Sequence, residues 1–424
     1  MTSPTLALAL SAVFLLGSAA PLRAQGHDDD YDDADPWVGF ESRTNPADSA
    51  AAGRFLRSLA ASDPVVCQLA VSSIGNHWGR WNDDDDRIGL LSDEATEHAA
   101  RESLSQSIVD PAALSLLAST LGDAHPCVRR AAARMLGESH SPSAIRLLRA
   151  ALRDGNSRIR ESAALGLAHA EDEGSFRDLT AAIKDKESPV VRMAAYALGE
   201  LEDARAVKSL GELLGSRDPA TRATAAWALG EIEDIRAVDR LKSLVRDDDP
   251  KVRLVSVEAL GEIEDYRSTS ALTDALKDQD VRVRRAAAQA LGEVEDHKAA
   301  GPLERALDDR DPVVRRLAAQ SLGELDGLKR APARLVTALA DRDAELVVIA
   351  ARALGEIGDT TTVPALATAY RSENPRLRYS IVSALAEMED SRGSDVLALA
   401  RKDQDQIVRH KASEVLRDRE DDDD

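Results

Sequence analysis

Apolar residues recur through most of the chain at the three- and four-residue spacing that is typical of amphipathic helices. In residues 234–265 two such runs follow one another, and an aspartate stands at the N-cap position of each, Asp234 and Asp249. Pro250 then occupies the first turn of the second run, where its missing N–H leaves no donor unsatisfied. The first run places these residues on one face: Val238, Leu241, Leu244 and Val245. The pattern predicts two antiparallel helices joined by a short turn.

The same pair of runs repeats along the chain with a nearly constant period. Most second runs end in Leu-Gly-Glu, and the glycine or its equivalent, hereafter the marker, recurs every 31 residues at positions 137, 168, 199, 230, 261, 292 and 323. Markers extend back to positions 106 and 75 and, after one inserted residue, on to 355, 386 and 417. Such a fixed period is typical of solenoids. The sequence therefore predicts an all-α fold, an α-solenoid of about twelve two-helix repeats of about 31 residues.

The residues before each marker are small or aliphatic, as in Ala225, Ala226, Ala228 and Leu229. Small side chains let neighbouring helix axes approach to the short end of the usual range of about 8–10 Å. A marker glycine costs about 1 kcal/mol in helix propensity relative to alanine, so a close contact at the helix end best explains it. The Leu-Gly-Glu phrase is therefore interpreted as a packing unit, and the aspartate after it is expected to cap the next helix.

The repeated residues resemble the HEAT-like repeats grouped with phycobilin lyases, whose pattern is similar to VRxxAAxALGxIxDxxAVxxLxxAL. The resemblance covers residues 48–417 and is sharpest over 110–325. It implies a right-handed superhelix whose second helices line the concave surface. Residues 76–94 depart from the pattern, because the four aspartates from Asp83 to Asp86 stand where a first helix needs apolar residues. We expect an irregular loop there.

An arginine column repeats with the same period, just before the small residues. In HEAT repeats the corresponding arginine bonds the aspartate of the preceding turn, so the resemblance implies a structural role, and an anion site is the alternative. The unit that ends at Gly355 has Val347 at this position. The column consists of Arg129, Arg160, Arg192, Arg222, Arg253, Arg284, Arg315, Arg378 and Arg409.

A glutamate column follows the markers. Successive members are expected to lie about one helix diameter apart, roughly 10 Å, which is too far for them to share one cation. We therefore expect a solvated edge. The column consists of Glu138, Glu200, Glu231, Glu262, Glu293, Glu324, Glu356 and Glu387.

No motif for catalysis stands out in the sequence. The eight histidines form neither an HExxH motif nor the His-Glu pair with which HEAT-like enzymes of the deoxyhypusine hydroxylase type hold iron. The sequence also contains no glycine-rich phosphate loop, nucleophile elbow or CxxC pair. We therefore predict no catalytic, metal-binding or cofactor-binding residue.

Residues 1–24 predict a signal peptide, with an apolar run from Leu6 to Ala20 and a cleavage point after Ala24. A membrane anchor is the alternative, but the run is shorter than the roughly 20 residues that a spanning helix needs. Residues 25–47 are then expected to be an acidic disordered linker, 48–417 the solenoid, and 418–424 an acidic tail. The mature protein is expected to be exported, periplasmic or extracellular, with no transmembrane segment.

The formal net charge is −21, of which residues 28–41 contribute −7 and residues 418–424 contribute −5. This balance disfavours nucleic acid as a partner, while a basic partner or loose cation binding is an alternative role for the acidic runs. Cys67 and Cys127 lie two units apart, or about 20 Å by helix diameter. A disulfide needs Cα atoms within about 7 Å, so we do not expect this bond unless the irregular unit collapses.

A candidate binding surface follows from one face of the second helices. The positions seven and three before the marker, with the glutamate after it, form an i, i+4, i+8 series, hereafter the stripe. Its residues vary while their neighbours do not, so the stripe is predicted to face solvent. The predicted partner-binding residues are Leu165, Tyr196, Trp227, Leu254, Arg130 and Arg134. The alternative is that Tyr196 and Trp227 fold down over neighbouring helices.

These features favour a non-enzymatic, exported and monomeric scaffold that binds a protein partner on the concave face of the solenoid. A lyase-type or accessory enzyme module related to bilin lyases is the alternative, although export argues against a cytosolic bilin partner. A purely structural spacer is a third possibility.

Overall fold

The computed structural model describes residues 49–60, 111–388 and 390–422. It divides the chain into an N-terminal unit, Met1–Leu201, and a C-terminal unit, Glu202–Asp424. Within the described residues every regular element is a helix, which confirms the all-α prediction. The predicted signal peptide, acidic linker and irregular loop lie outside the described residues, so these predictions stay untested.

Helix pairs make up the described part of the N-terminal unit. Its helices are α2 (Ser49–Ala60), α5 (Pro111–Thr120), α6 (Pro126–Glu138), α7 (Pro142–Ala151), α8 (Ser157–Ala170), α9 (Phe176–Ala182) and α10 (Ser188–Glu200). The second helices α6, α8 and α10 pack on one another in chain order, and each also packs on the first helix of its own pair.

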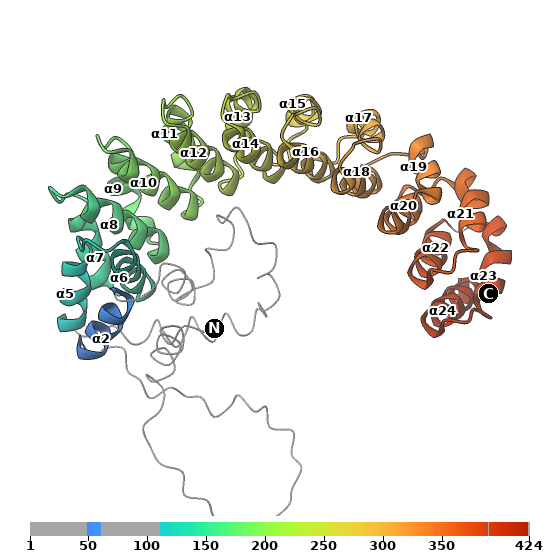
Figure 1. The fold of residues 1–424 in the computed structure, drawn as a ribbon, viewed down its shortest axis with the longest axis horizontal. Coiled ribbons are helices and arrows are strands. Elements are labelled where there is room, and N and C mark those ends of the chain that lie inside the picture. Colours follow the sequence, from blue (N-terminus) through green and yellow to red (C-terminus); the bar gives the residue numbers. More distant parts are fainter. Residues whose placement is uncertain (1–48, 61–110, 389, 423–424) are drawn as a thin grey trace, which may run out of the picture. The chain divides into compact units, whose positions relative to one another are not determined.

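The C-terminal unit continues the same alternation. Its first helices are α11 (Val207–Leu213), α13 (Val238–Leu244), α15 (Thr269–Ala275), α17 (Ala300–Ala306), α19 (Ala333–Thr337), α21 (Val363–Ala369) and α23 (Ser394–Ala400). Its second helices are α12 (Pro219–Glu231), α14 (Pro250–Glu262), α16 (Val281–Glu293), α18 (Pro312–Glu324), α20 (Ala344–Ile357), α22 (Pro375–Glu387) and α24 (Gln406–Asp422). Within this unit, second helices form one layer and first helices the other (Figure 1). Each second helix packs on the next, as a solenoid requires.

Aspartate caps begin the helices where the sequence predicts them. The Asp249 carboxylate accepts hydrogen bonds from the backbone N–H groups of Lys251 and Val252, at 2.8 and 3.4 Å. Asp265 follows the Leu-Gly-Glu phrase at the end of α14. Its carboxylate accepts a hydrogen bond from the backbone N–H of Arg267 at 2.9 Å and begins the short 3₁₀ turn before α15. These bonds satisfy donors that the start of a helix leaves open.

A left-handed residue ends most second helices, three positions after the marker. Glu202, Glu233, Glu264 and Glu295 have φ between 48° and 55°, and Gly358 takes the same position with φ 68°. This conformation lets the chain reverse direction into the next first helix. It favours glycine, because a side chain in the left-handed region meets its own backbone.

The marker glycines lie where successive second helices come closest. A Cβ on Gly261 would overlap Oε2 of Glu293 and would lie only 2.8 Å from Cβ of Ala290 on α16. The same crowding recurs at Gly230, Gly292, Gly323 and Gly355, each against the next second helix. The predicted packing role of the marker is therefore confirmed.

The inserted residue disturbs one repeat. After α18 the backbone leaves the helix at Leu325 in an extended conformation, and Gly327 has φ 69°. The first helix of this pair, α19, has only 5 residues. The Asp359 side chain holds the irregular loop in place, because its carboxylate accepts a hydrogen bond from the Ala331 N–H at 3.0 Å.

We predict that Gly261→Ala destabilises the C-terminal unit. Alanine would gain about 1 kcal/mol of helix propensity, but an overpacked contact costs about 1–3 kcal/mol. Urea unfolding followed by circular dichroism should show a lower midpoint. The control is Gly301→Ala in α17, where a new Cβ would lie 3.7 Å from Nη1 of Arg305, an ordinary contact, so that variant should not lose stability. An unchanged or higher midpoint for Gly261→Ala would contradict the packing role.

A second substitution separates backbone strain from crowding. At Gly358 the nearest neighbour of a new Cβ is 4.0 Å away, so space is available and only the positive φ opposes a side chain. Gly358→Ala should therefore lower the free energy of unfolding by about 1 kcal/mol. Glu264→Gly should have the opposite sign, and thermal melting of both variants tests the pair.

Candidate partner-binding surface

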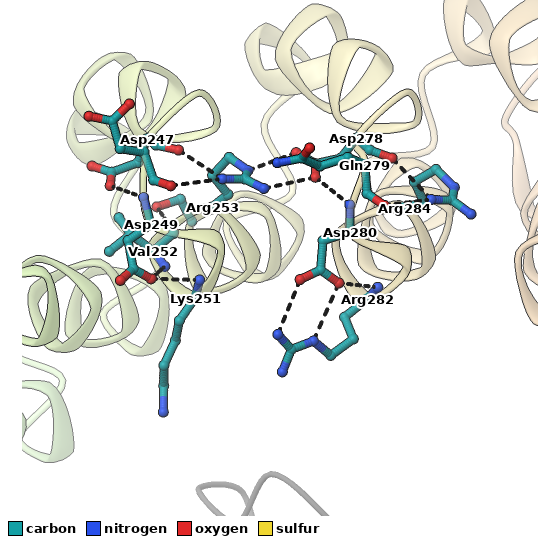
Figure 2. A network of polar contacts seen from close by, with 12 residues as sticks. Asp247, Asp249, Lys251, Val252, Arg253, Asp278, Gln279, Asp280, Arg282 and Arg284 are labelled. Atoms are coloured by element: carbon teal, nitrogen blue, oxygen red, sulfur yellow. Dashed lines mark hydrogen bonds and ion pairs between the residues drawn. The ribbon is translucent and has the colours of Figure 1, made fainter.

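The arginine column forms bridges between successive units. Arg253 on α14 donates from Nε and Nη2 to the Asp278 carboxylate at 2.8 and 2.9 Å, and its Nη1 donates to the carbonyl oxygens of Asp247 and Asp248 (Figure 2). Asp278 lies in the turn between α15 and α16 and also accepts the Asp280 N–H at 2.8 Å. One guanidinium therefore joins the turn before its own helix to the turn of the next unit.

The same two-point bridge repeats along both units. Its members are Arg160 with Asp185, Arg222 with Asp247, Arg253 with Asp278, Arg284 with Asp309, and Arg378 with Asp403. The predicted structural role is confirmed, and the predicted bond to the preceding turn is made, but to backbone carbonyl oxygens instead of an aspartate side chain. The preceding turn supplies backbone carbonyl oxygens, and the aspartate comes from the following unit because the guanidinium spans the gap between neighbouring turns. With Nε, Nη1 and Nη2 all donating, these arginines are poor candidates for an anion site.

The bridge weakens where the repeat is irregular. Because of the insertion, the residue 25 positions after Arg315 is Ala340, and the closest carboxylate oxygen is that of Asp343 at 3.8 Å. The neighbouring Arg316 bonds Asp343 instead, at 2.8 Å from Nη2. Since α20 carries Val347 at the arginine position, two consecutive units lack the regular bridge.

The bridge holds the aspartate in its charged form. Asp403 accepts two hydrogen bonds from Arg378, one from the Tyr370 hydroxyl and one from the Asp405 N–H. These donors, the arginine first, lower the pKa of Asp403 to about 2. Burial and the bond to Asp403 raise the pKa of Tyr370, so the phenol stays a donor.

The glutamate column is more enclosed than predicted. Glu231, Glu262 and Glu293 are half-buried, while Glu324, Glu356 and Glu387 are exposed. Each carboxylate from Glu262 onward lies over the marker glycine of the preceding second helix. Residues on the same helix support several of them, as Gln289 donates to Glu293 at 2.9 Å. The expected solvated edge therefore holds for the last three members, whereas Glu231, Glu262 and Glu293 are partly covered.

Four of the predicted partner-binding residues belong to the N-terminal unit. Arg130 is exposed and Tyr196 is half-buried. Arg134 and Leu165 are only 1% and 3% exposed, so the expectation that the stripe faces solvent is wrong at these two positions. Leu165 is on α8, which packs between α6 and α10, and Arg134 lies beside Glu138, with 3.6 Å between Nε and Oε1. Burial lowers the pKa of the Arg134 guanidinium.

The other two predicted residues belong to the C-terminal unit. Trp227 on α12 and Leu254 on α14 are both half-buried. Their exposure fits a surface that a partner touches and also fits side chains that lie against neighbouring helices. A role of the six residues in partner binding stays a prediction.

A groove opens on the stripe among the last second helices of the C-terminal unit. It has a volume of about 480 Å³ and lies over α20, α22 and the start of α24. Its apolar residues are Val348, Ile349, Pro375, Tyr379 and Ile407, and its charged residues are Glu345, Arg352, Arg376 and Asp405. Tyr379 and Ile407 are 39% and 68% exposed. In this groove large apolar side chains reach solvent on the second-helix layer.

Sequence reasoning missed the groove but had a signal for it. Val348 and Tyr379 stand seven positions before their markers and Arg352 stands three before, so all three belong to the predicted stripe. The predicted partner-binding residues end at Leu254 and so do not reach these positions. Ile407 carried no such signal, because its exposure depends on how α24 packs.

Cys127 is buried and disulfide-bonded in the structure. The only other cysteine of the sequence, Cys67, lies outside the described residues. The expectation that spacing opposes a disulfide is therefore wrong for Cys127. That expectation assumed a regular stack through the unit that contains the four-aspartate run.

Within the described residues, no group of three or more His, Cys, Asp or Glu side chains is placed to hold a metal ion. None of the described helices combines the length and apolarity needed to cross a membrane.

The stacked helix pairs and their bridges define an α-solenoid repeat protein. A family model described as HEAT repeats matches residues 114–198, 176–251, 241–323 and 332–417. These segments span most of the chain, which therefore belongs to the HEAT repeat family, and the predicted resemblance is confirmed.

Three solved structures match parts of this chain. An engineered protein is 22% identical and covers 72% of this chain and 98% of its own, with a TM-score of 0.47. The complex of CpcE and CpcF of phycocyanin lyase from Nostoc sp. PCC7120 is 25% identical and covers 60% and 92%, with a TM-score of 0.34. The E. coli protein YibA is 18% identical and covers 71% and 99%, with a TM-score of 0.46. No curated protein matches the sequence.

The bridge predicts a defined pH dependence. Because the folded state lowers the pKa of Asp403 to about 2 from an unfolded value of about 3.9, its stabilising contribution is full above about pH 4 and is lost as the pH falls toward 2. Asp403→Asn should therefore destabilise the protein at pH 6 and lose this disadvantage near pH 2. The urea unfolding midpoints of the wild type and the Asp403→Asn variant at several pH values measure this difference in stability. A difference between them that does not vary with pH would contradict the ionised bridge.

Proposed function

We propose that the protein is a non-enzymatic, exported scaffold that binds a protein partner through the stripe of its second helices. The groove over α20, α22 and α24 carries the proposal, since its apolar side chains Tyr379 and Ile407 are exposed on the second-helix layer. Exposed apolar residues of this kind are typical of protein interfaces. The family supports the proposal at the level of the fold, because solenoids present extended binding surfaces.

The other charged features of the fold already have structural roles. The arginine column bonds carbonyl oxygens and aspartates, and the cap aspartates hold helix starts. Arg236 pairs with its cap Asp234 and also donates to the Ala204 carbonyl oxygen at 3.0 Å. The stripe is therefore the better place for a function that requires accessible side chains.

Export rests on two observations. The apolar run from Leu6 to Ala20 has the length of a signal-peptide core. The disulfide of Cys127 is the chemistry of an oxidising compartment, such as the periplasm or the cell exterior.

The scaffold proposal predicts that capture of a partner depends on the stripe. Full-length protein should retain a discrete partner from an envelope extract, identified by mass spectrometry. Trp227→Ala with Leu254→Ala, or Tyr379→Ala with Ile407→Ala, should reduce the retained partner about tenfold, as expected for loss of interface anchors. The matched control replaces Ile235 and Tyr266, which are 56% and 68% exposed at the turns before first helices, and it should retain the partner fully.

Circular dichroism must show equal helical content in all these variants. Equal capture by wild type and both stripe variants would contradict the proposal. The alternative, a lyase-type or accessory enzyme related to bilin lyases, predicts a coloured or metal-bearing protein when it is purified from its host. An absorbance band above the aromatic region would support that alternative against the scaffold.

A further inference from the structure

The groove has an apolar floor and a defined direction. On α20 the residues Glu345, Val348, Ile349 and Arg352 share one helical face with Glu356, and on α22 Tyr379 shares one with Glu387. The groove therefore runs along both helices toward the two glutamates that follow the markers. Asp405 also lines the groove and caps α24 by accepting the Ile407 N–H at 2.9 Å.

The charges along this path do not balance. Arg376 bonds Glu345 at 3.2 and 3.3 Å, and Lys411, near Tyr379, is paired with Glu414 at 3.0 Å. Among the lining residues, the two arginines Arg352 and Arg376 offset Glu345 and Asp405. Adding Glu356 and Glu387 leaves a formal charge of −2 on the groove and its open end.

The two glutamates are held in place without full neutralisation. Oε1 of Glu356 is 3.5 Å from Nε of Arg352, longer than a hydrogen bond, and its side chain remains 36% exposed. A Cβ on Gly355 would lie 2.8 Å from Oε2 of Glu387, so this carboxylate lies over the preceding helix end. Burial, followed by repulsion from Glu387 and Glu324, raises the pKa of Glu356 despite Arg352. A cation placed here would relieve that repulsion.

We infer that the groove binds a cationic segment of a partner protein, with a large apolar or aromatic side chain between Ile349, Tyr379 and Ile407 and a basic side chain at Glu356 and Glu387. This inference rests on the proposed scaffold function and specifies its partner. Tyr379 and Glu387 are eight positions apart on α22, or about 12 Å along the helix. An extended peptide covers that distance in about three or four residues.

The spacing gives a simple recognition rule. The partner segment should carry an apolar pair followed, about three or four residues later, by two basic residues. The two carboxylates select the sign of the partner's charge and the position of the peptide along the groove, while the apolar contact supplies most of the affinity. Acidic segments should be rejected by the same two carboxylates.

The test uses the full chain and two fluorescein-labelled peptides of equal length. Both contain Trp-Leu, which is followed after a Gly-Ser-Gly spacer by Lys-Lys in one peptide and by Glu-Glu in the other. Fluorescence anisotropy should show that the Lys-Lys peptide binds at least about tenfold more tightly than the Glu-Glu peptide at low salt, with the preference shrinking at high salt.

Two double variants assign the binding to the groove. Glu356→Gln with Glu387→Gln should weaken the Lys-Lys peptide by about fivefold or more and leave the Glu-Glu peptide unweakened. Tyr379→Ala with Ile407→Ala should weaken it by about tenfold. The charge-matched control, Asp239→Asn with Asp395→Asn, alters exposed residues of first helices and should change little. Ile235→Ala with Tyr266→Ala is the control for apolar exposure.

The outcomes separate this inference from the scaffold proposal. Equal affinity for both peptides, or a loss shared by the control variants, overturns the inference. If the envelope partner is captured through Trp227 and Leu254 while neither peptide binds, the scaffold stands and the cationic groove falls. If the chain self-associates and the Tyr379 and Ile407 double variant abolishes this, a second copy fills the groove and the inference also falls. Failure of both capture and peptide binding removes both proposals.

Discussion

The stacking depends on a recurring bridge, in which a guanidinium ties a turn of its own unit to an aspartate of the next. Arg253 shows the arrangement, with two carbonyl oxygens on one side and the Asp278 carboxylate on the other. Both side chains of the pair are largely buried, so removing one partner would leave the other charge without compensation, at a cost of about 3–5 kcal/mol. Apolar packing between Ala- and Leu-rich helices provides the attraction, and the bridge fixes how far each unit lies from the next.

Close packing of the second helices follows from the same spacing. At Gly261 the next helix approaches so closely that a methyl group would meet both Ala290 and Glu293. The repeated Leu-Gly-Glu phrase therefore combines three roles in neighbouring residues: an apolar contact, a point of closest approach, and a carboxylate over the neighbouring helix end. In the earlier units these carboxylates are half-buried, whereas Glu356 and Glu387 stay exposed and accessible to a partner.

The groove lies beside the least regular part of the C-terminal unit. One inserted residue removes the usual partner of Arg315, and Val347 replaces the arginine on α20. The α20 and α22 helices next to this region carry Val348 and Tyr379 at the stripe position that Arg285 and Arg316 occupy in α16 and α18. A repeat array can acquire a specific site in this manner, because changes in one unit affect only its immediate neighbours.

The sequence by itself determined the helix pairs, their period, the aspartate caps and the packing role of the marker glycines. All of these depend on short-range spacing that recurs many times, so local patterns were sufficient. It also selected the stripe as the surface to consider. The tertiary structure decided which aspartate each arginine bonds, that Leu165 and Arg134 are buried, and that the groove opens between α20 and α24. Those features depend on the distance between neighbouring helices and on which side chains meet across it. The spacing of residues within a single repeat does not specify that distance.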